Sequence, residues 1–169
     1  MIQEDSLILD HQQTLNKIRR IAYEVYENNF EEEEIIFAGI YDTGYLFAEI
    51  LAAEFQKVAP ISHQLIKIKL DKASPTQSDV EISDSEMDFT NKVIVIADDV
   101  LNTGKTIVYS LRPFLKVPVK KIQVAVIVDR NHLSFPVEAT FVGYELSTTV
   151  NQHIEVKLET GQPYSVYLK

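Results

Sequence analysis

The chain shows two patterns of hydrophobic residues, helical stripes and short continuous runs. Between residues 15 and 26 the apolar side chains recur at intervals of three and four, which is typical of a helix that buries one face. The continuous runs are bounded by polar or turn-forming residues and are typical of buried strands. They predict strands at 35–40, 63–70, 93–97 and 122–128, with further helices over about 45–57 and 104–116.

These elements alternate along the chain as strand and helix. Parallel strands need crossover connections, and strands that are apolar throughout must be covered on both faces. The order therefore predicts an α/β fold with a central parallel sheet flanked by helices. Three further strands, at 139–142, 153–158 and 165–168, lack intervening helices and are expected to form a small cap or edge. No repeat or linker divides the chain, so residues 1–169 are predicted to form a single domain.

Residues 71–91 form a long polar connection that contains Pro75 and one candidate short strand at 80–82. A connection of this length inside a compact domain is more often a functional flap than idle chain. We expect this flap to be mobile.

Composition and charge narrow the class of protein. Apolar residues make up 46% of the chain and charged residues 24%, the ordinary mix of a globular protein. There is no cysteine, which excludes disulfides and thiolate metal sites, and the 4 histidines lack metal-ligand spacing. The N-terminus lacks the pattern of an export signal and no apolar run approaches the roughly 20 residues that span a bilayer, so a cytoplasmic protein with no membrane partner is expected. The net charge of −9 gives no general support for nucleic-acid binding.

The segment 93–106, VIVIADDVLNTGKT, carries the strongest candidate chemistry. Its strand delivers two adjacent carboxylates, Asp98 and Asp99, to the carboxyl end of the sheet. Open α/β sheets bind their ligands at this edge. The acid pair is therefore a candidate to bind hydroxyl groups or a metal ion.

A turn at 103–106 follows the acids and opens the next helix, whose free N–H groups suit a phosphate. The hydroxyls of Thr103 and Thr106 would add donors, and Gly104 lets the backbone approach closely. A phosphorylated ribose matches this layout, although a plain strand-turn-helix joint with solvated acids is equally compatible with the residues alone. A Walker A loop is excluded, because Asp99 stands where that motif requires its first glycine.

The same segment resembles the phosphoribosyl-pyrophosphate signature of type I phosphoribosyltransferases. Two longer stretches, LDHQQTLNKIRRIAYEVYENN at 9–29 and AVIVDRNHLSFPVEATFVGYELSTT at 125–149, are similar to the pyrimidine operon attenuator proteins that double as uracil phosphoribosyltransferases. The resemblance covers most of the chain. It implies a Rossmann-like type I fold with a flexible flap at 71–91, and a small hood with the C-terminal strands at 129–169.

The resemblance also implies a role for each matching residue. Asp98 and Asp99 would be the catalytic pair, binding the ribose hydroxyls of 5-phosphoribosyl-1-pyrophosphate (PRPP) directly or through Mg²⁺, the implied cofactor. The 5-phosphate would be cradled by Asn102, Thr103, Gly104, Lys105 and Thr106. The pyrophosphate loop would consist of Tyr41, Asp42, Thr43 and Gly44. The flap would close over the reacting centre while a base nitrogen displaces pyrophosphate at the ribose C1.

A nucleobase is the implied second substrate, with uracil first among the acceptors, and two alternatives stay open. The stretch GIYDTGYLFAEIL is also similar to the hypoxanthine-guanine enzymes, which usually place an acid where Asn102 stands. An asparagine cannot accept a proton as a base, which counts against a 6-oxopurine acceptor.

The chain also differs from the attenuator-type enzymes at three places. Those enzymes carry Lys and Arg in the pyrophosphate loop, an arginine at the place of Ser147-Thr148-Thr149, and the sequence Tyr-Arg-Asp-Asp in the flap, and this chain carries none of these. The second alternative is therefore a ligand-sensing or regulatory protein with little turnover.

Base recognition is predicted in the C-terminal part. Phe141 could stack on a planar ring and the backbone of Val142 could read its edge, with core packing as the competing interpretation. Asp129 and Arg130 end the fourth predicted strand and could touch the ligand, or could form a surface ion pair. The family commonly forms dimers or larger homo-oligomers, which we expect here, whereas the acidic charge argues against RNA as a partner.

Overall fold

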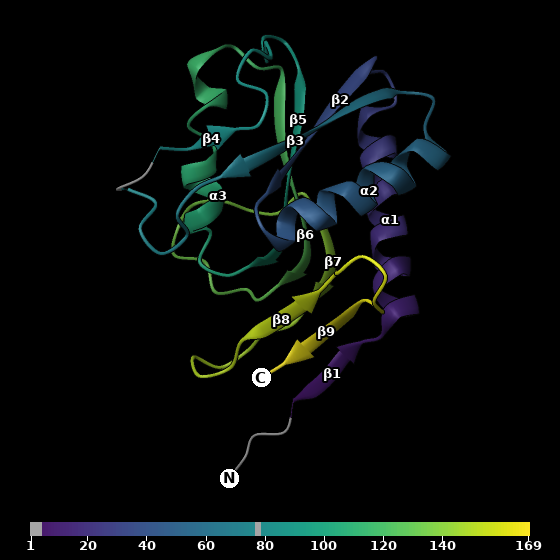
Figure 1. The fold of residues 1–169 in the computed structure, drawn as a ribbon, viewed down its shortest axis with the longest axis vertical. Helices are drawn as coiled ribbons and strands as arrows, with labels where there is room; N and C mark the ends of the chain where they lie inside the picture. Colours follow the sequence, from purple (N-terminus) through teal and green to yellow (C-terminus); the bar gives the residue numbers. More distant parts are fainter. Residues whose placement is uncertain (1–4, 77–78) are drawn as a thin grey trace.

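The computed structural model describes residues 5–76 and 79–169, which build two β-sheets (Figure 1). The strands of the larger sheet lie in the order β4-β3-β2-β5-β6-β7. All pairings in it are parallel except that of β4 with β3 at one edge. The strands are β2 (Glu34–Ile40), β3 (Ser62–Lys69), β4 (Glu81–Ile82), β5 (Val93–Leu101), β6 (Lys121–Asp129) and β7 (Phe141–Glu145). The predicted α/β class with a central parallel sheet is confirmed.

The smaller sheet joins the two ends of the described chain. It contains β1 (Ser6–Leu9), β9 (Ser165–Leu168) and β8 (Ile154–Lys157), all antiparallel, with β9 in the middle. Figure 1 shows this sheet below the larger one. The sequence patterns predicted β8 and β9 but not β1.

The helices cover the larger sheet on both faces (Figure 1). Helices α1 (His11–Asn29) and α2 (Thr43–Val58) lie on one face, and α3 (Lys105–Ser110) lies on the other. A capping box begins α1. The Asp10 side chain accepts a hydrogen bond from the backbone N–H of Gln13, and the Gln13 side chain accepts one from the backbone N–H of Asp10.

None of the helices in the described ranges has both the length and the hydropathy needed to cross a membrane.

Two hydrophobic cores explain why the central strands are apolar throughout. Successive side chains of a strand point to opposite faces of its sheet. In β2, Ile35 and Phe37 pack beneath α1 and α2, whereas Ile36 and Ala38 pack in the core on the face of α3. The residues of β5 alternate in the same way. These strands are thus fixed at the centre of the fold, and their carboxyl ends form a rigid edge.

Three elements differ from the sequence prediction in ways that matter for the site. Strand β5 continues past residue 97 to Leu101, so the two acids lie within the strand. Helix α3 ends at Ser110 instead of 116, because Pro113 lacks an N–H group and its ring obstructs the helical backbone, and a 3-10 turn (Phe114–Lys116) follows. Strand β7 is the edge of the larger sheet, so the separate C-terminal cap begins only with β8.

The segment 71–91 contains the short strand expected near 80–82, which the structure shows as β4 paired with β3. Residues 77–78 of the expected flap lie outside the described residues. The mobility of this segment stays a prediction.

Candidate ligand-binding site

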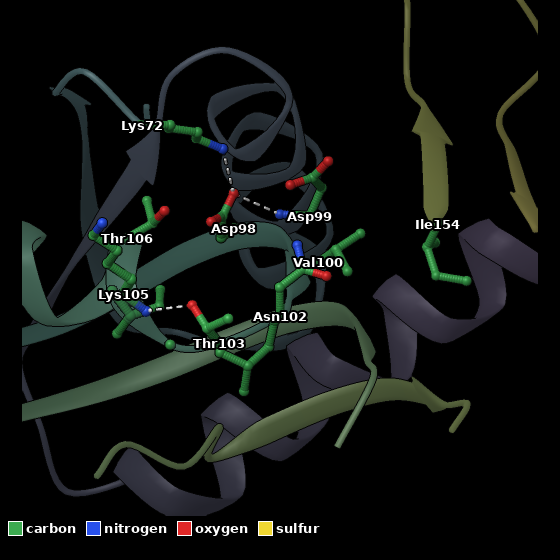
Figure 2. A pocket seen from close by; sticks show the side chains of 12 residues that line it. Lys72, Asp98, Asp99, Val100, Asn102, Thr103, Lys105, Thr106 and Ile154 are labelled. Carbon is green, nitrogen blue, oxygen red and sulfur yellow. Dashed lines mark hydrogen bonds and ion pairs between the residues drawn. The ribbon is translucent and has the colours of Figure 1, made fainter. Parts of the chain in front are cut away.

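The carboxyl end of β5 lines a cavity of about 370 Å³ (Figure 2). Asp98 and Asp99 line it together with every residue of the stretch 102–106. Lys72 reaches it from the segment after β3, and Ile154 from β8. The two halves of the predicted signature therefore face one space, at the edge of the sheet where parallel strands place their ligands.

The two acids occupy different environments. Asp98 is 3% exposed and its Oδ1 accepts the backbone N–H of Asp99 at 2.9 Å, whereas Asp99 itself is partly exposed. Burial raises the pKa of Asp98 well above its usual range, the negative charge of Asp99 raises it further, and the ammonium of Lys72 opposes both. Asp98 thus needs a cation beside it to carry its charge, and Asp99 is the more accessible ligand.

Lys72 is a residue of the site that the sequence analysis missed. Its Nζ lies 3.3 Å from Asp98 Oδ1, and Figure 2 shows it above the acid pair. It lies in the polar segment after β3, where no hydrophobic period or motif marks it. Only the parallel pairing of β3 with β2, and of β2 with β5, brings the end of β3 to the same edge as the acids.

The turn at 103–106 is shaped by its glycine and tied to a neighbouring loop. Gly104 has a φ of +84°, which a residue with a side chain rarely adopts, and an added Cβ would lie 2.4 Å from Val137 Cγ2. The carbonyl of Thr103 accepts the N–H groups of Ser134 and Phe135 at 2.9 and 3.1 Å. The turn is therefore held in place before any ligand binds.

The predicted pyrophosphate loop, residues 41–44, packs beside the acid pair but does not line the cavity. The peptide bond between Tyr41 and Asp42 is cis, and the N–H of Tyr41 donates to the carbonyl of Ile68 at 2.8 Å. A Cβ added to Gly44 would lie 2.9 Å from Asp98 Oδ1. Glycine is thus required where the start of α2 meets the end of β5, and this contact brings the loop to the acids.

Two lysines of β3 lie over aromatic rings within this loop and directly after it. The Nζ of Lys67 is 5.3 Å from the centroid of the Tyr41 ring and 4.5 Å from that of Tyr45. The Nζ of Lys69 is 5.5 Å from the centroid of the Tyr41 ring. The loop itself carries an acid and no base, so positive charge comes to it from the neighbouring strand.

Two of the residues predicted to bind the base lie elsewhere. Phe141 is 1% exposed and packs in the core beneath α1 and α2, so neither face of its ring is open to a ligand. The carbonyl of Val142 accepts a hydrogen bond from Arg20 at 2.9 Å. Neither residue lines the cavity, because β7 continues the larger sheet instead of folding over the site. Core packing, the competing interpretation, is the role that the geometry gives to Phe141.

The other two predicted residues, Asp129 and Arg130, lie at the end of β6. Asp129 is buried and its Oδ1 accepts the N–H of Asn131 at 2.8 Å. Arg130 forms no ion pair within the described ranges, but donates from Nη1 to Asn102 Oδ1 at 2.7 Å. It therefore reaches the site through a residue that lines the cavity.

The donor set fits Mg²⁺ only with help from a ligand. No group of three or more Asp, Glu, His or Cys side chains gathers in the described part of the chain, so the protein offers the two carboxylates of Asp98 and Asp99. Mg²⁺ is commonly held by one or two carboxylates, with water and substrate phosphate oxygens completing its coordination. The acid pair meets that requirement.

The chain is similar to known proteins over most of its length. A family model described as "Phosphoribosyl transferase domain" matches residues 6–160. The Bifunctional protein PyrR of Fusobacterium nucleatum is 35% identical over 160 residues, which cover 90% of each chain. The protein of the same name from Macrococcus caseolyticus is 31% identical over 170 residues, which cover 96% of this chain and 98% of that one.

Solved structures of hypoxanthine phosphoribosyltransferases share the fold. The Trypanosoma cruzi enzyme superimposes with a TM-score of 0.76 at 11% identity, over 96% of this chain and 95% of that one. The Staphylococcus aureus enzyme gives a TM-score of 0.72 at 16% identity, over 88% of this chain and 80% of that one. At such identities the likeness establishes the fold alone.

Proposed function

The chain belongs to the phosphoribosyl transferase family, and on this premise we propose that it transfers the 5-phosphoribosyl group of PRPP to a nucleobase, with uracil as the favoured acceptor. The observation that carries the proposal is the shared cavity at the end of β5, where Asp98 and Asp99 face the same space as the 103–106 turn. A carboxylate pair and a phosphate-binding turn this close can hold the two ends of one sugar phosphate.

In this proposal the turn binds the 5-phosphate. The hydroxyls of Thr103 and Thr106 and the ammonium of Lys105 supply donors, and the fixed backbone around Gly104 allows close approach. Holding the phosphate fixes the sugar, so that its C1 lies in a constant position relative to the acceptor.

The acids bind the ribose side, and Mg²⁺ is the proposed cofactor. Asp99 and Asp98 would hold the ion, which when bound supplies positive charge that neutralises the pyrophosphate. Lys72, already beside Asp98, is positioned to meet the pyrophosphate as the segment 71–91 closes. The C1–O bond breaks with its electron pair leaving on pyrophosphate. The lone pair of the base nitrogen forms the new C1–N bond, and the proton of that nitrogen is released to water. The negative field of the acids stabilises the positive charge that develops on the sugar.

The choice of uracil rests on the relatives named PyrR and on Asn102. An amide at this position cannot act as a proton acceptor for a purine ring. The purine alternative is kept because the stretch GIYDTGYLFAEIL resembles the hypoxanthine-guanine enzymes.

A panel of uracil, cytosine, adenine, hypoxanthine and guanine tests the proposal, with pyrophosphate release measured in the presence of PRPP and Mg²⁺. We expect release with uracil, loss of at least about a hundredfold in D99N, and no loss in the matched variant D5N. Asp5 is an exposed acid in the described N-terminal part, paired with Lys169 outside the cavity. Release with hypoxanthine alone would move the acceptor to the purines.

A second candidate function is a ligand-sensing protein with little turnover, which the acidic loop 41–44 favours. Isothermal titration of PRPP with Mg²⁺ separates the two. Binding without pyrophosphate release for any base would support the sensor, whereas absence of both would overturn the two proposals together.

A further inference from the structure

Arg130 holds separate segments of the chain together on one side of the cavity. Its Nη1 donates to Asn102 Oδ1 at 2.7 Å, which reaches the loop after β5. Its Nε donates to Thr148 Oγ1 at 2.8 Å, and its Nη2 donates to the carbonyl of Gln152 at 2.7 Å. A planar guanidinium with five donors is suited to satisfy several oxygens at once. Arg130 therefore connects the loop after β5 to the segment between β7 and β8.

The contact with Arg130 fixes which way the Asn102 amide points. A guanidinium has donors and no acceptor, so the oxygen of the amide must face it and the N–H₂ group must face away. Asn102 lines the cavity, and Figure 2 shows its amide rising into that space beside Val100. Over residues 5–76 and 79–169, the Asn102 N–H₂ donates to no protein group. The cavity thus receives from this side chain a fixed donor and no acceptor.

The two sides of the cavity differ in chemistry. The hydroxyls and the ammonium of 103–106 lie on one side, and the apolar side chains of Val100 and Ile154 lie on the other, which is the side of Asn102 (Figure 2). Sites for flat organic rings combine apolar surface with a few directional polar groups. The side formed by Val100, Asn102 and Ile154 has this composition, whereas the opposite side suits a phosphate.

With the acceptor base placed on the side of Val100 and Ile154, we propose that Arg130 is a positioning residue which aims the Asn102 N–H₂ at a keto oxygen of that base. The inference rests on the phosphoribosyl transfer proposed above and names the property that selects its acceptor. A base that offers an N–H at this place meets a second donor and loses a hydrogen bond. Uracil, which has keto oxygens on both sides of its ring, satisfies the requirement.

The direct test observes the Asn102 amide without relying on turnover. Uridine 5′-monophosphate is titrated into isotope-labelled protein, and the side-chain N–H₂ signals of Asn102 are assigned by their loss in N102A. We expect the chemical shifts of these signals to change with nucleotide concentration in proportion to the fraction of protein that has bound the nucleotide. Binding that leaves them unmoved overturns this inference alone, and absence of any binding overturns the proposed function as well.

Kinetics of a double-mutant cycle test the role of Arg130. N102A and R130M are each expected to raise KM for uracil about tenfold, and the double variant should raise it no more than either. In R130M the Kd for PRPP is expected to stay within about twofold. The matched control is R19M, which removes a partly exposed arginine paired with Glu54 outside the cavity and should leave KM unchanged. A fall in PRPP affinity equal to that for uracil, or additive effects, would show that Arg130 acts only on the stability of the fold.

Thio analogues keep the inference testable if R130M does not fold. Sulfur is a weaker hydrogen-bond acceptor than oxygen, so the protein should prefer uracil about tenfold over 2-thiouracil or over 4-thiouracil, depending on which oxygen meets Asn102. N102A should lose that preference. Equal preference in the two proteins would overturn the assignment of a keto oxygen to Asn102.

Discussion

At the level of single residues, Asp98 is where the demands of folding and of ligand binding conflict most. Its carboxylate is 3% exposed, lies beside the charge of Asp99, and has one cation, Lys72, in contact with it among the described residues. A buried carboxylate that lacks full compensation destabilises the folded state. The site therefore retains a carboxylate that lowers the stability of the folded state, which is typical of residues retained for binding.

The substitution D98N should stabilise the protein at neutral pH. The pKa of Asp98 is raised in the folded state, so between its unfolded value and that raised value the folded state binds more protons, and stability falls as the pH rises. The asparagine variant lacks this dependence. It should be more stable than the natural protein near pH 7, and the difference should shrink as the pH falls toward the pKa of an aspartate in the unfolded chain, about 4. Urea unfolding at the two pH values measures this; a variant less stable near pH 7 would show that Lys72 fully compensates the charge.

Lys72 should act on pyrophosphate and not on the sugar phosphate. Lys72 and Lys105 are the lysines that line the cavity, and Lys105 belongs to the 103–106 turn. K72Q is expected to weaken binding of inorganic pyrophosphate with Mg²⁺ about tenfold, or about 1.4 kcal/mol, and to leave binding of ribose 5-phosphate unchanged. K57Q, an exposed lysine on α2, serves as the control. Equal losses for both ligands in calorimetry would instead indicate a general change in the site.

At the level of elements, the joint of β5, the 103–106 turn and α3 could be predicted because its signals are local. A continuous apolar run, two acids and a glycine before a helix identify it without reference to the rest of the chain. Lys72 and the contact between Arg130 and Asn102 could not be predicted, because strand order and parallel register bring these residues together. The strand pattern at 139–142 likewise does not reveal which sheet the strand joins, so the sequence could not show that Phe141 packs in the core outside the cavity.

The packing of α2 on β5 depends on Gly44, which gives a prediction at this level. A methyl group at residue 44 would lie 2.9 Å from both the carbonyl oxygen of Ala97 and Asp98 Oδ1, so G44A must move the start of α2 away from the acids. We expect a loss of about 1–3 kcal/mol in stability and weaker binding of PRPP.

The control for this variant is G161A. Gly161 has a φ of +81° with nothing within 4 Å of an added Cβ, so alanine there should cost about 1 kcal/mol without affecting PRPP. Urea unfolding and calorimetry on both variants make the comparison. Unchanged PRPP affinity in G44A would mean that the loop 41–44 is not part of the site.

At the level of the whole molecule, the smaller sheet connects the two ends of the described chain and contributes to the site. Strand β9 pairs with β1 on one side and with β8 on the other, and β8 brings Ile154 to the cavity. The pairing of Ser6 with Leu168 is a contact between residues at opposite ends of the sequence, which no local pattern can reveal. Folding of the N-terminal strand is therefore coupled to the position of one wall of the cavity.

The charge of the whole molecule leads to the last prediction, which concerns RNA. A net charge of −9 repels a polyanion, and unspecific affinity for nucleic acids comes mainly from phosphate contacts made by lysine and arginine. We expect no retardation of a pyrimidine-leader RNA at about 10 µM protein in physiological salt, a concentration at which many nucleic-acid-binding proteins already bind unspecifically. A retarded complex that dissociates steeply as salt is added would instead reveal a local basic surface strong enough to overcome the field of the whole protein.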